Sequence, residues 1–164
     1  MAKNGFSMSN RVVVEELESA KTVSVDDCGK VFILAQTAGL TASLPQAAQA
    51  ETGWNCSFVV SDQAAANKSY KIVLDSASPD TEVIVGTAMA VAENKGTPGT
   101  GLCEATGAGS ATKAIYLEDT EAGGMQGSRV DLYTDGGRWF AHAVLHASGS
   151  TAVPLDLSKV FRNS

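Results

Sequence analysis

Short segments in which every second residue is apolar recur along this chain, and no other feature constrains its fold as strongly. Trp54, Cys56, Phe58 and Val60 form one such segment. Successive side chains of a β-strand point to opposite faces, so this spacing predicts strands with one buried face. The same spacing recurs around residues 23–25, 40–44, 70–74, 89–91 and 130–134.

The number and spacing of these segments favour two packed sheets. Roughly eight to ten short strands separated by turn residues are typical of sandwiches and barrels. Helices long enough to connect parallel strands are missing from the pattern. We therefore expect an all-β fold, an antiparallel β-sandwich or jelly-roll-like domain, with one short helix. That helix is predicted over residues 45–52, since Pro45 suits a first helical position and Gly53 a stop.

Both ends of the chain differ in composition from the strand-rich middle. We expect an N-terminal arm at residues 1–20, the β-sandwich domain at 21–148, and a C-terminal tail or edge strand at 149–164. Residues 93–112 are rich in Gly, Thr, Ala and Ser, which predicts a long loop or a short strand around Leu102 and Cys103.

Local patterns refine this prediction. Asp135-Gly136-Gly137 between two alternating segments predicts a tight hairpin turn. The continuous apolar run 31–34 predicts a strand buried on both faces, and Gly86 predicts a bulge or bend. The alternation as a whole predicts a core that includes Val31, Ile33, Leu44, Trp54, Phe58, Ile72, Leu74, Val130 and Leu132.

Composition excludes several classes of function. The net charge is −6 and the Lys and Arg residues are scattered singly, so we expect no nucleic-acid binding. No apolar run is long enough for a signal peptide or a membrane span, so we expect a protein that is made and used without crossing a membrane. Cys28, Cys56 and Cys103 are odd in number and far apart, which predicts no zinc or redox motif and no disulfide.

Residues that could carry chemistry form no recognised constellation. His142 and His146 have a helical zinc spacing but lie in a predicted strand, and the acidic clusters Asp26-Asp27 and Glu118-Asp119-Glu121 match no spaced calcium loop. Nucleophile elbows and phosphate loops are missing. We expect no enzyme activity, no catalytic residue, no cofactor and no metal. Trp54 is expected in the core, whereas Trp139 is a candidate for a sugar-binding face.

Two segments of the sequence, read together, point to a known module. The first comprises Asp27-Cys28-Gly29-Lys30-Val31-Phe32-Ile33-Leu34, then Leu40-Thr41-Ala42-Ser43-Leu44-Pro45, then Gly53 to Val60. The second is Gly127 to Phe140, with Asp135-Gly136-Gly137-Arg138-Trp139 at its hairpin. In this order they resemble a virion module of tailed phages, found in head decoration (cement) proteins and in tail fibres. The resemblance covers about residues 25–141 and leaves 93–112 unmatched.

The resemblance implies structure and attachment rather than catalysis. Fibres usually contain long repetitive shafts, and this short chain shows none, which favours a capsid decoration protein. Such a protein binds the major capsid protein on the outer surface of the head and stabilises it, on the virion, after synthesis in the host cytoplasm. The alternative is a small tail or receptor-binding protein with a carbohydrate-binding β-sandwich.

The same analogy implies a homotrimer. Apolar residues near both ends are expected to stay partly exposed, so residues 1–20 or 150–164 are predicted to contact neighbouring subunits or the capsid. These residues are Val12, Val13, Val14 and Leu17 at one end, and Leu155, Leu157, Val160 and Phe161 at the other.

Overall fold

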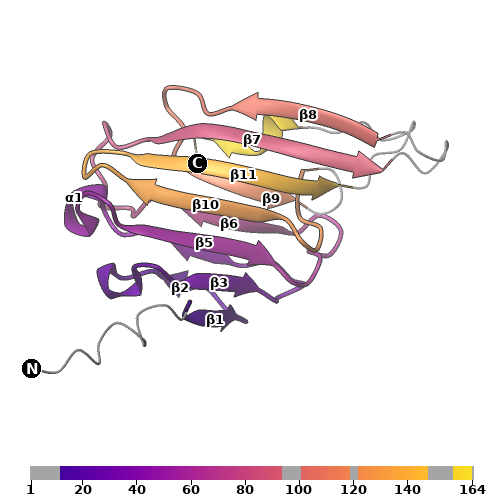
Figure 1. The fold of residues 1–164 in the computed structure, drawn as a ribbon, viewed down its shortest axis with the longest axis horizontal. Coiled ribbons are helices and arrows are strands. Elements are labelled where there is room, and N and C mark those ends of the chain that lie inside the picture. The colour runs from indigo at the N-terminus through magenta and orange to yellow at the C-terminus, as the bar shows by residue number, and fades with distance from the viewer. Residues whose placement is uncertain (1–11, 94–100, 119–121, 148–156, 164) are drawn as a thin grey trace, which may run out of the picture.

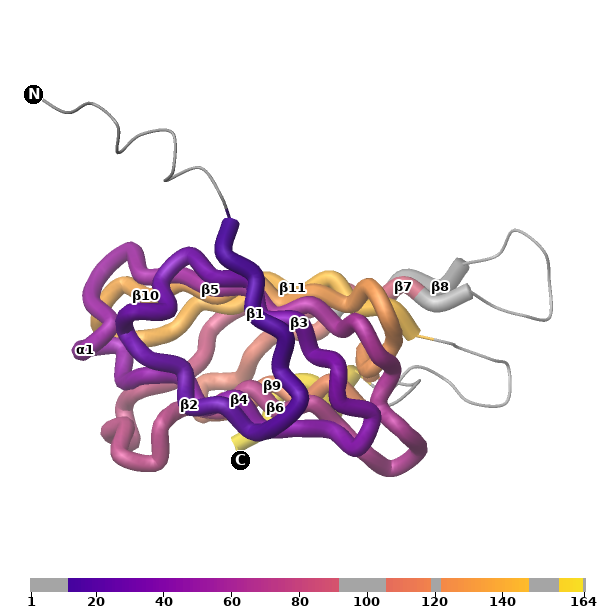
Figure 2. The backbone as a smooth tube through the Cα atoms, turned by 90° about the horizontal axis from the view of Figure 1, so that it is seen from below, coloured from indigo at the N-terminus to yellow at the C-terminus, as the bar shows by residue number. Residues whose placement is uncertain are grey.

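A computed structural model describes residues 12–93, 101–118, 122–147 and 157–163, which form a two-layered β-sandwich (Figures 1 and 2). The predicted all-β class is confirmed. One layer is a seven-stranded sheet, in the order β1 (Val14–Leu17), β3 (Val31–Leu34), β5 (Asn55–Val60), β10 (Arg129–Thr134), β11 (Trp139–Ala147), β7 (Ile84–Glu93) and β8 (Gly101–Gly107). The other layer is a five-stranded sheet, in the order β12 (Phe161–Arg162), β9 (Ala114–Glu118), β6 (Ser69–Val73), β4 (Thr41–Ser43) and β2 (Lys21–Thr22).

The first six strands alternate between the two layers. β1, β3 and β5 are parallel neighbours in one sheet, and β2, β4 and β6 are parallel neighbours in the other. The pairing is therefore mixed, and not antiparallel throughout, as the predicted antiparallel sandwich implied. A chain that changes layer after every strand returns to its starting sheet in the same direction. The strand of the opposite layer thus serves as the crossover, and no helix is needed.

The hairpin predicted at residues 135–137 is confirmed. β10 and β11 pair antiparallel, with Thr134 opposite Trp139. In the turn, the backbone N–H groups of Gly137 and Arg138 each donate to Asp135 Oδ1 at 2.9 Å. Gly136 has φ +88°, a conformation that glycine adopts without a steric penalty. The side chain of Asp135 and the backbone freedom of Gly136 together close the turn.

Most of the predicted core is buried, but one strand faces the other way. Val31 and Ile33 are only half-buried on the outer face of the seven-stranded sheet, whereas Phe32 and Leu34 are fully buried. Phe32 stacks on Phe58, with ring centroids 5.1 Å apart. Four successive apolar residues fit either face, so the alternation could not orient this strand. The remaining predicted core residues are buried: Leu44, Trp54, Phe58, Ile72, Leu74, Val130 and Leu132.

Two tryptophans and one carboxylate close one end of the sandwich. Trp139 is fully buried and meets Trp54 edge-to-face, with ring centroids 5.3 Å apart. Trp139 Nε1 donates to the buried Glu82 Oε1 at 3.2 Å, and the backbone N–H of Ala47 donates to the same oxygen at 3.2 Å. This contact fixes the start of α1 (Ala47–Ala50), which is shorter than the predicted helix.

Two short 3-10 helices complete the secondary structure: η1 (Val25–Asp27) and η2 (Leu157–Lys159). Trp54 Nε1 donates to the carbonyl oxygen of Val25 in η1 at 2.7 Å. None of the helices in the described ranges has both the length and the apolar character needed to cross a membrane.

Gly86 is a point of close backbone approach and not a bulge. It pairs with Ala141 in an uninterrupted parallel ladder between β7 and β11. A Cβ atom added at Gly86 would lie 1.9 Å from the carbonyl oxygen of Ala141. Glycine is therefore required here because the neighbouring strand leaves no room for a side chain.

Both terminal segments take part in the sandwich. β1, within the segment predicted as an arm, is an edge strand that buries Leu17, and β12 is an edge strand paired with β9. Leu157 and Val160 are buried and Phe161 packs against the core, so the expectation that these residues stay exposed is wrong. Val12, Val13 and Val14 are exposed as predicted. Residues 1–11 and 148–156, including Leu155, lie outside the described residues.

The glycine-rich segment at 93–112 contains a strand. β8 begins at Gly101 and pairs antiparallel with β7, placing Cys103 opposite Val91. The short strand considered around Leu102 and Cys103 is therefore present and is longer than expected. Residues 94–100 lie outside the described part of the chain.

Phe58 provides a direct test of this core. Replacing Phe58 by Ala removes a fully buried ring stacked on Phe32, so we expect a loss of unfolding free energy of about 3–5 kcal/mol. Urea denaturation followed by tryptophan fluorescence measures it. Tyr133→Ala is the control, because that ring is 52% exposed and its loss should cost less than about 1 kcal/mol. A near-neutral Phe58→Ala variant would contradict the facing assigned to β5.

Candidate functional site

The outer face of the seven-stranded sheet carries a cluster of exposed apolar side chains. On β7, Val85, Met89 and Val91 are 37%, 40% and 45% exposed. Their neighbours on β11 are Phe140 opposite Val85 and Val144 opposite Met89. Tyr133 of β10 lies opposite Phe140. We call this set the outer patch: Val85, Met89, Val91, Tyr133, Phe140 and Val144.

An exposed aromatic pair lies at the hairpin end of the outer patch. Tyr133 and Phe140 stack with ring centroids 5.0 Å apart and planes inclined by 10°. The guanidinium of Arg138 lies 5.9 Å from the centroid of the Phe140 ring. The two rings stack on each other and lie opposite one another on paired strands, so both are held in place before any partner binds. This lowers the side-chain entropy that binding through these rings would cost.

A polar network borders the outer patch at the centre of the sheet. Arg129 Nε donates to both carboxylate oxygens of Asp131, at 2.8 and 3.0 Å. Ser57 Oγ donates to Asp131 Oδ1 at 2.5 Å. Burial raises the pKa of Asp131, but the hydrogen bonds from Arg129 and Ser57 outweigh it and hold that pKa below its usual value. The network therefore presents a fixed, satisfied ion pair beside the apolar surface.

Beyond this network a second apolar band reaches the edge of the sheet. Val59 of β5 lies beside Ile33 of β3, and Val31 lies beside the exposed Val14 of β1. The outer face thus consists of apolar areas separated by polar residues, because the row Thr87, His142, Asp131 and Ser57 crosses β7, β11, β10 and β5.

The outer face of the five-stranded sheet has a different character. Thr41, Lys71 and Tyr116 form one row across β4, β6 and β9. Arg162 lies over the Tyr116 ring at 4.3 Å and forms an ion pair with Glu118. This face is largely polar, so the apolar character of the outer patch is specific to one side of the molecule. Such one-sided exposure makes the outer patch the candidate interaction surface.

His142 and His146 lie on the outer face but do not converge. Both are exposed on β11, four residues apart on one strand. A strand rises about 3.3 Å per residue, which separates them by about 13 Å, too far to share a metal ion. Within the described residues no group of three or more metal-ligating side chains occurs.

The acidic clusters noted in the sequence are used in ion pairs. Asp27 is buried and lies 2.5 Å from Lys30 Nζ, while its Oδ2 accepts from the Ser24 backbone N–H at 2.8 Å. Lys30 and Lys21 also bind Glu15, at 3.0 and 2.6 Å. In the second cluster Glu118 binds Arg162, whereas Asp119 and Glu121 lie outside the described residues.

The structure describes the side chains of two of the three cysteines, Cys28 and Cys56. Cys28 is exposed and Cys56 is buried, and both are free thiols. Burial raises the pKa of Cys56, which disfavours its thiolate. The side chain of Cys103 lies outside the described side chains, so the expected lack of a disulfide stays a prediction.

The buried position of Trp139 removes the sugar-binding face considered for it. Two aromatic side chains that reach the outer face of the seven-stranded sheet, Tyr133 and Phe140, were missed by the sequence reasoning. Their signal was present in the sequence: Tyr133 alternates with buried Leu132 and Thr134, and Phe140 with buried Trp139 and Ala141.

Comparison with known proteins adds no relative. A scan against protein-family models found no match, and searches of curated proteins and of solved structures found none either.

The ion pairs of Asp27 predict how stability depends on pH. Burial raises the pKa of Asp27. Hydrogen bonds from Lys30 and Ser24 and the nearby lysine charges lower that pKa by more, so the net pKa lies below its usual value. The pKa of Glu15 is depressed by its hydrogen bonds from Lys21 and Lys30. Such groups stabilise the fold fully above their unfolded pKa values of about 3.9 and 4.3, and this contribution is lost as pH falls through the folded values.

We therefore expect the urea midpoint of the wild type to fall between roughly pH 5 and pH 3, and to fall less steeply in Asp27→Asn. Asp26→Asn is the matched control, because the neighbouring Asp26 side chain is exposed. Equal slopes for wild type and Asp27→Asn would show that the ion pairs do not contribute.

Proposed function

We propose that this chain is a capsid decoration protein of a tailed phage, and that the outer patch binds the major capsid protein and so stabilises the head. The observation that supports this proposal is the exposed apolar surface on one side of a fully β scaffold. The resemblance of residues 25–141 to the phage virion module supports the choice of partner.

The composition of the outer patch fits a protein interface. Aromatic residues, Met and Arg are enriched at such interfaces, and the patch combines Tyr133, Phe140 and Met89 with Arg138 beside it. The central Arg129–Asp131 pair already satisfies its own hydrogen bonds, so it can face a partner without leaving an unpaired charge. Rigid strands carry all these contacts, which suits a permanent structural attachment.

The alternative, a small tail or receptor-binding protein with a sugar-binding face, has less support. Trp139 and Trp54 are both buried, so neither indole can stack on a sugar from solution. The glycine-rich segment at 93–112, which a sugar-binding protein could use as a binding loop, is partly the paired strand β8. Quantitative gels of purified virions would separate the two roles, because hundreds of copies indicate the capsid and a few to a few dozen indicate the tail.

The docking role of the outer patch is tested by Tyr133→Ala. Tyr133 is half-exposed and forms one side of the aromatic stack, so its loss should weaken binding to undecorated heads by tenfold or more, as for an interface hot spot. Co-sedimentation of purified protein with heads lacking it measures the affinity. Val25→Ala is the control, since Val25 is also exposed, at 42%, but lies in η1. Equal binding by wild type and Tyr133→Ala would contradict the assigned surface.

We also propose a homotrimer whose contacts involve the β1 edge. Val12, Val13 and Val14 are 62%, 56% and 59% exposed at the edge of the seven-stranded sheet. A strand edge with exposed apolar residues can pair with a neighbouring subunit. The C-terminal segment is a poor candidate for this role, because Leu157 and Val160 belong to the subunit's own core.

Light scattering on the purified protein should give a trimer, and the double variant Val12→Asp, Val14→Asp should shift it toward monomer. Val85→Asp is the control, because it adds the same charge at an exposed valine on β7, which four strands separate from β1 in the sheet. A monomeric wild type at micromolar concentration would contradict the trimer. A trimer that persists in the double variant would contradict the role of the β1 edge.

A further inference from the structure

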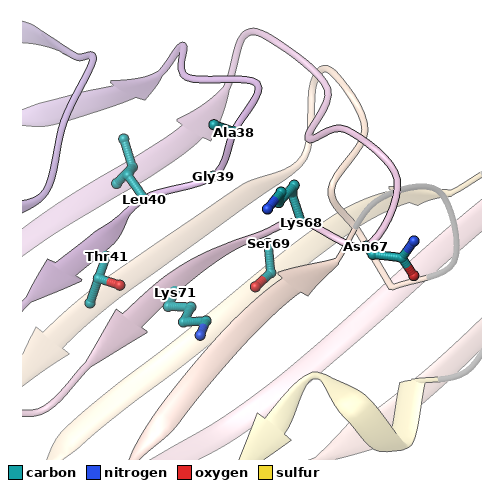
Figure 3. Close-up of a pocket in the computed structure, with 8 residues that line it drawn as sticks. All are labelled: Ala38, Gly39, Leu40, Thr41, Asn67, Lys68, Ser69 and Lys71. Carbon is teal, nitrogen blue, oxygen red and sulfur yellow. The ribbon is translucent and has the colours of Figure 1, made fainter.

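A small polar pocket lies at one end of the five-stranded sheet, away from the outer patch. Two segments form it, residues 38–41 before and within β4 and residues 67–71 before and within β6, and they enclose about 310 Å³. Figure 3 shows Lys68, Ser69 and Lys71 along one segment, with Thr41 on the neighbouring strand. The lining residues include two lysines, two hydroxyl side chains and no carboxylate: Ala38, Gly39, Leu40, Thr41, Asn67, Lys68, Ser69 and Lys71.

The two lysines differ from six other basic residues of the described chain. Lys21, Lys30, Lys113, Arg129, Arg138 and Arg162 each form an ion pair with a carboxylate. Across the described ranges, Lys68 and Lys71 have no carboxylate within salt-bridge distance. The chain holds 18 acidic and 12 basic residues, so two uncompensated cations in one pocket are not a result of excess base.

The backbone around the pocket is closely fitted. A Cβ atom at Gly39 would lie 2.3 Å from the Ser69 carbonyl oxygen, so glycine allows the two segments to meet. Asn67 adopts the left-handed conformation, with φ +62°. The chain turns there, and the backbone of Ser69 then lies beside Gly39. The half-buried Lys71 is held by the Tyr116 ring, whose centroid lies 5.1 Å from its Nζ.

We infer that this pocket binds a phosphate monoester group. Two ammonium groups match the charge of a monoester, about −1.5 to −2 at pH 7, better than that of a single carboxylate. Lysine binds phosphate as a compact point charge, and the hydroxyls of Thr41 and Ser69 can donate to its remaining oxygens. The pocket is open to solvent, which leaves room for the rest of a small polar ligand. This inference is independent of the decoration role and of the outer patch.

Amide chemical shifts of the full-length, isotope-labelled protein test the inference, with glycerol 3-phosphate, inorganic phosphate and acetate as probes. We expect glycerol 3-phosphate to give saturable shifts confined to residues 38–41 and 67–71. Lys68→Gln and Lys71→Gln should each weaken its binding about tenfold, as expected for a charge-assisted hydrogen bond. Binding should also weaken from pH 7 to pH 5, because the monoester gains a proton near pH 6.

The matched control is Lys113→Gln, which removes the same charge beside β9 but outside the pocket, where Lys113 pairs with Asp80. It should bind glycerol 3-phosphate as the wild type does. Tighter binding of glycerol 3-phosphate than of inorganic phosphate would identify an ester ligand, and equal binding would identify the free ion; both support the site. Acetate binding as tightly, shifts spread over all basic residues, or an equal loss in Lys113→Gln would overturn it.

Discussion

The buried carboxylate of Glu82 is the interaction on which one end of the sandwich depends. A buried acidic group is costly unless hydrogen bonds satisfy it, and one oxygen of Glu82 accepts from Trp139, from the backbone of Ala47 and from the hydroxyl of Ser78. These contacts join the start of β11 to the start of α1. Because β11 lies between β10 and β7, its fixed position also sets the register that aligns Tyr133, Phe140 and Val85 on the outer face.

The two layers of the sandwich present surfaces of different chemical character. The seven-stranded sheet presents an apolar surface with preformed aromatic contacts, which is suited to another protein surface. The five-stranded sheet presents a polar surface and a small basic pocket. Both features are built on paired strands, so neither needs a large rearrangement before binding.

Much of the fold could be predicted from the sequence because alternation reports directly on burial. Trp54 to Val60 and the hairpin around Gly136 show this most clearly. The direction of strand pairing could not be predicted, because the apolar alternation of β3 and β5 is the same in parallel and antiparallel ladders. The prediction that Val31 and Ile33 face the core was wrong for a related reason. Phe32 and Leu34 are equally hydrophobic and alternate with them, so the sequence does not show which pair is buried. Tyr133 and Phe140 were missed because exposure depends on what the other sheet covers.

The alternation of the first six strands between layers has a consequence for how the chain reaches its native state. No two consecutive strands among β1–β6 pair with each other, so each ladder there closes only after an intervening segment has crossed the core. Hairpins, by contrast, close short loops: β10 with β11, and β7 with β8. Loop-closure entropy therefore favours folding that begins in the C-terminal half. Strands β1–β6 then add to that half late. A ribosome synthesises the N-terminal half first, so strands β1–β6 stay unfolded during synthesis until the C-terminal strands with which they pack have been made.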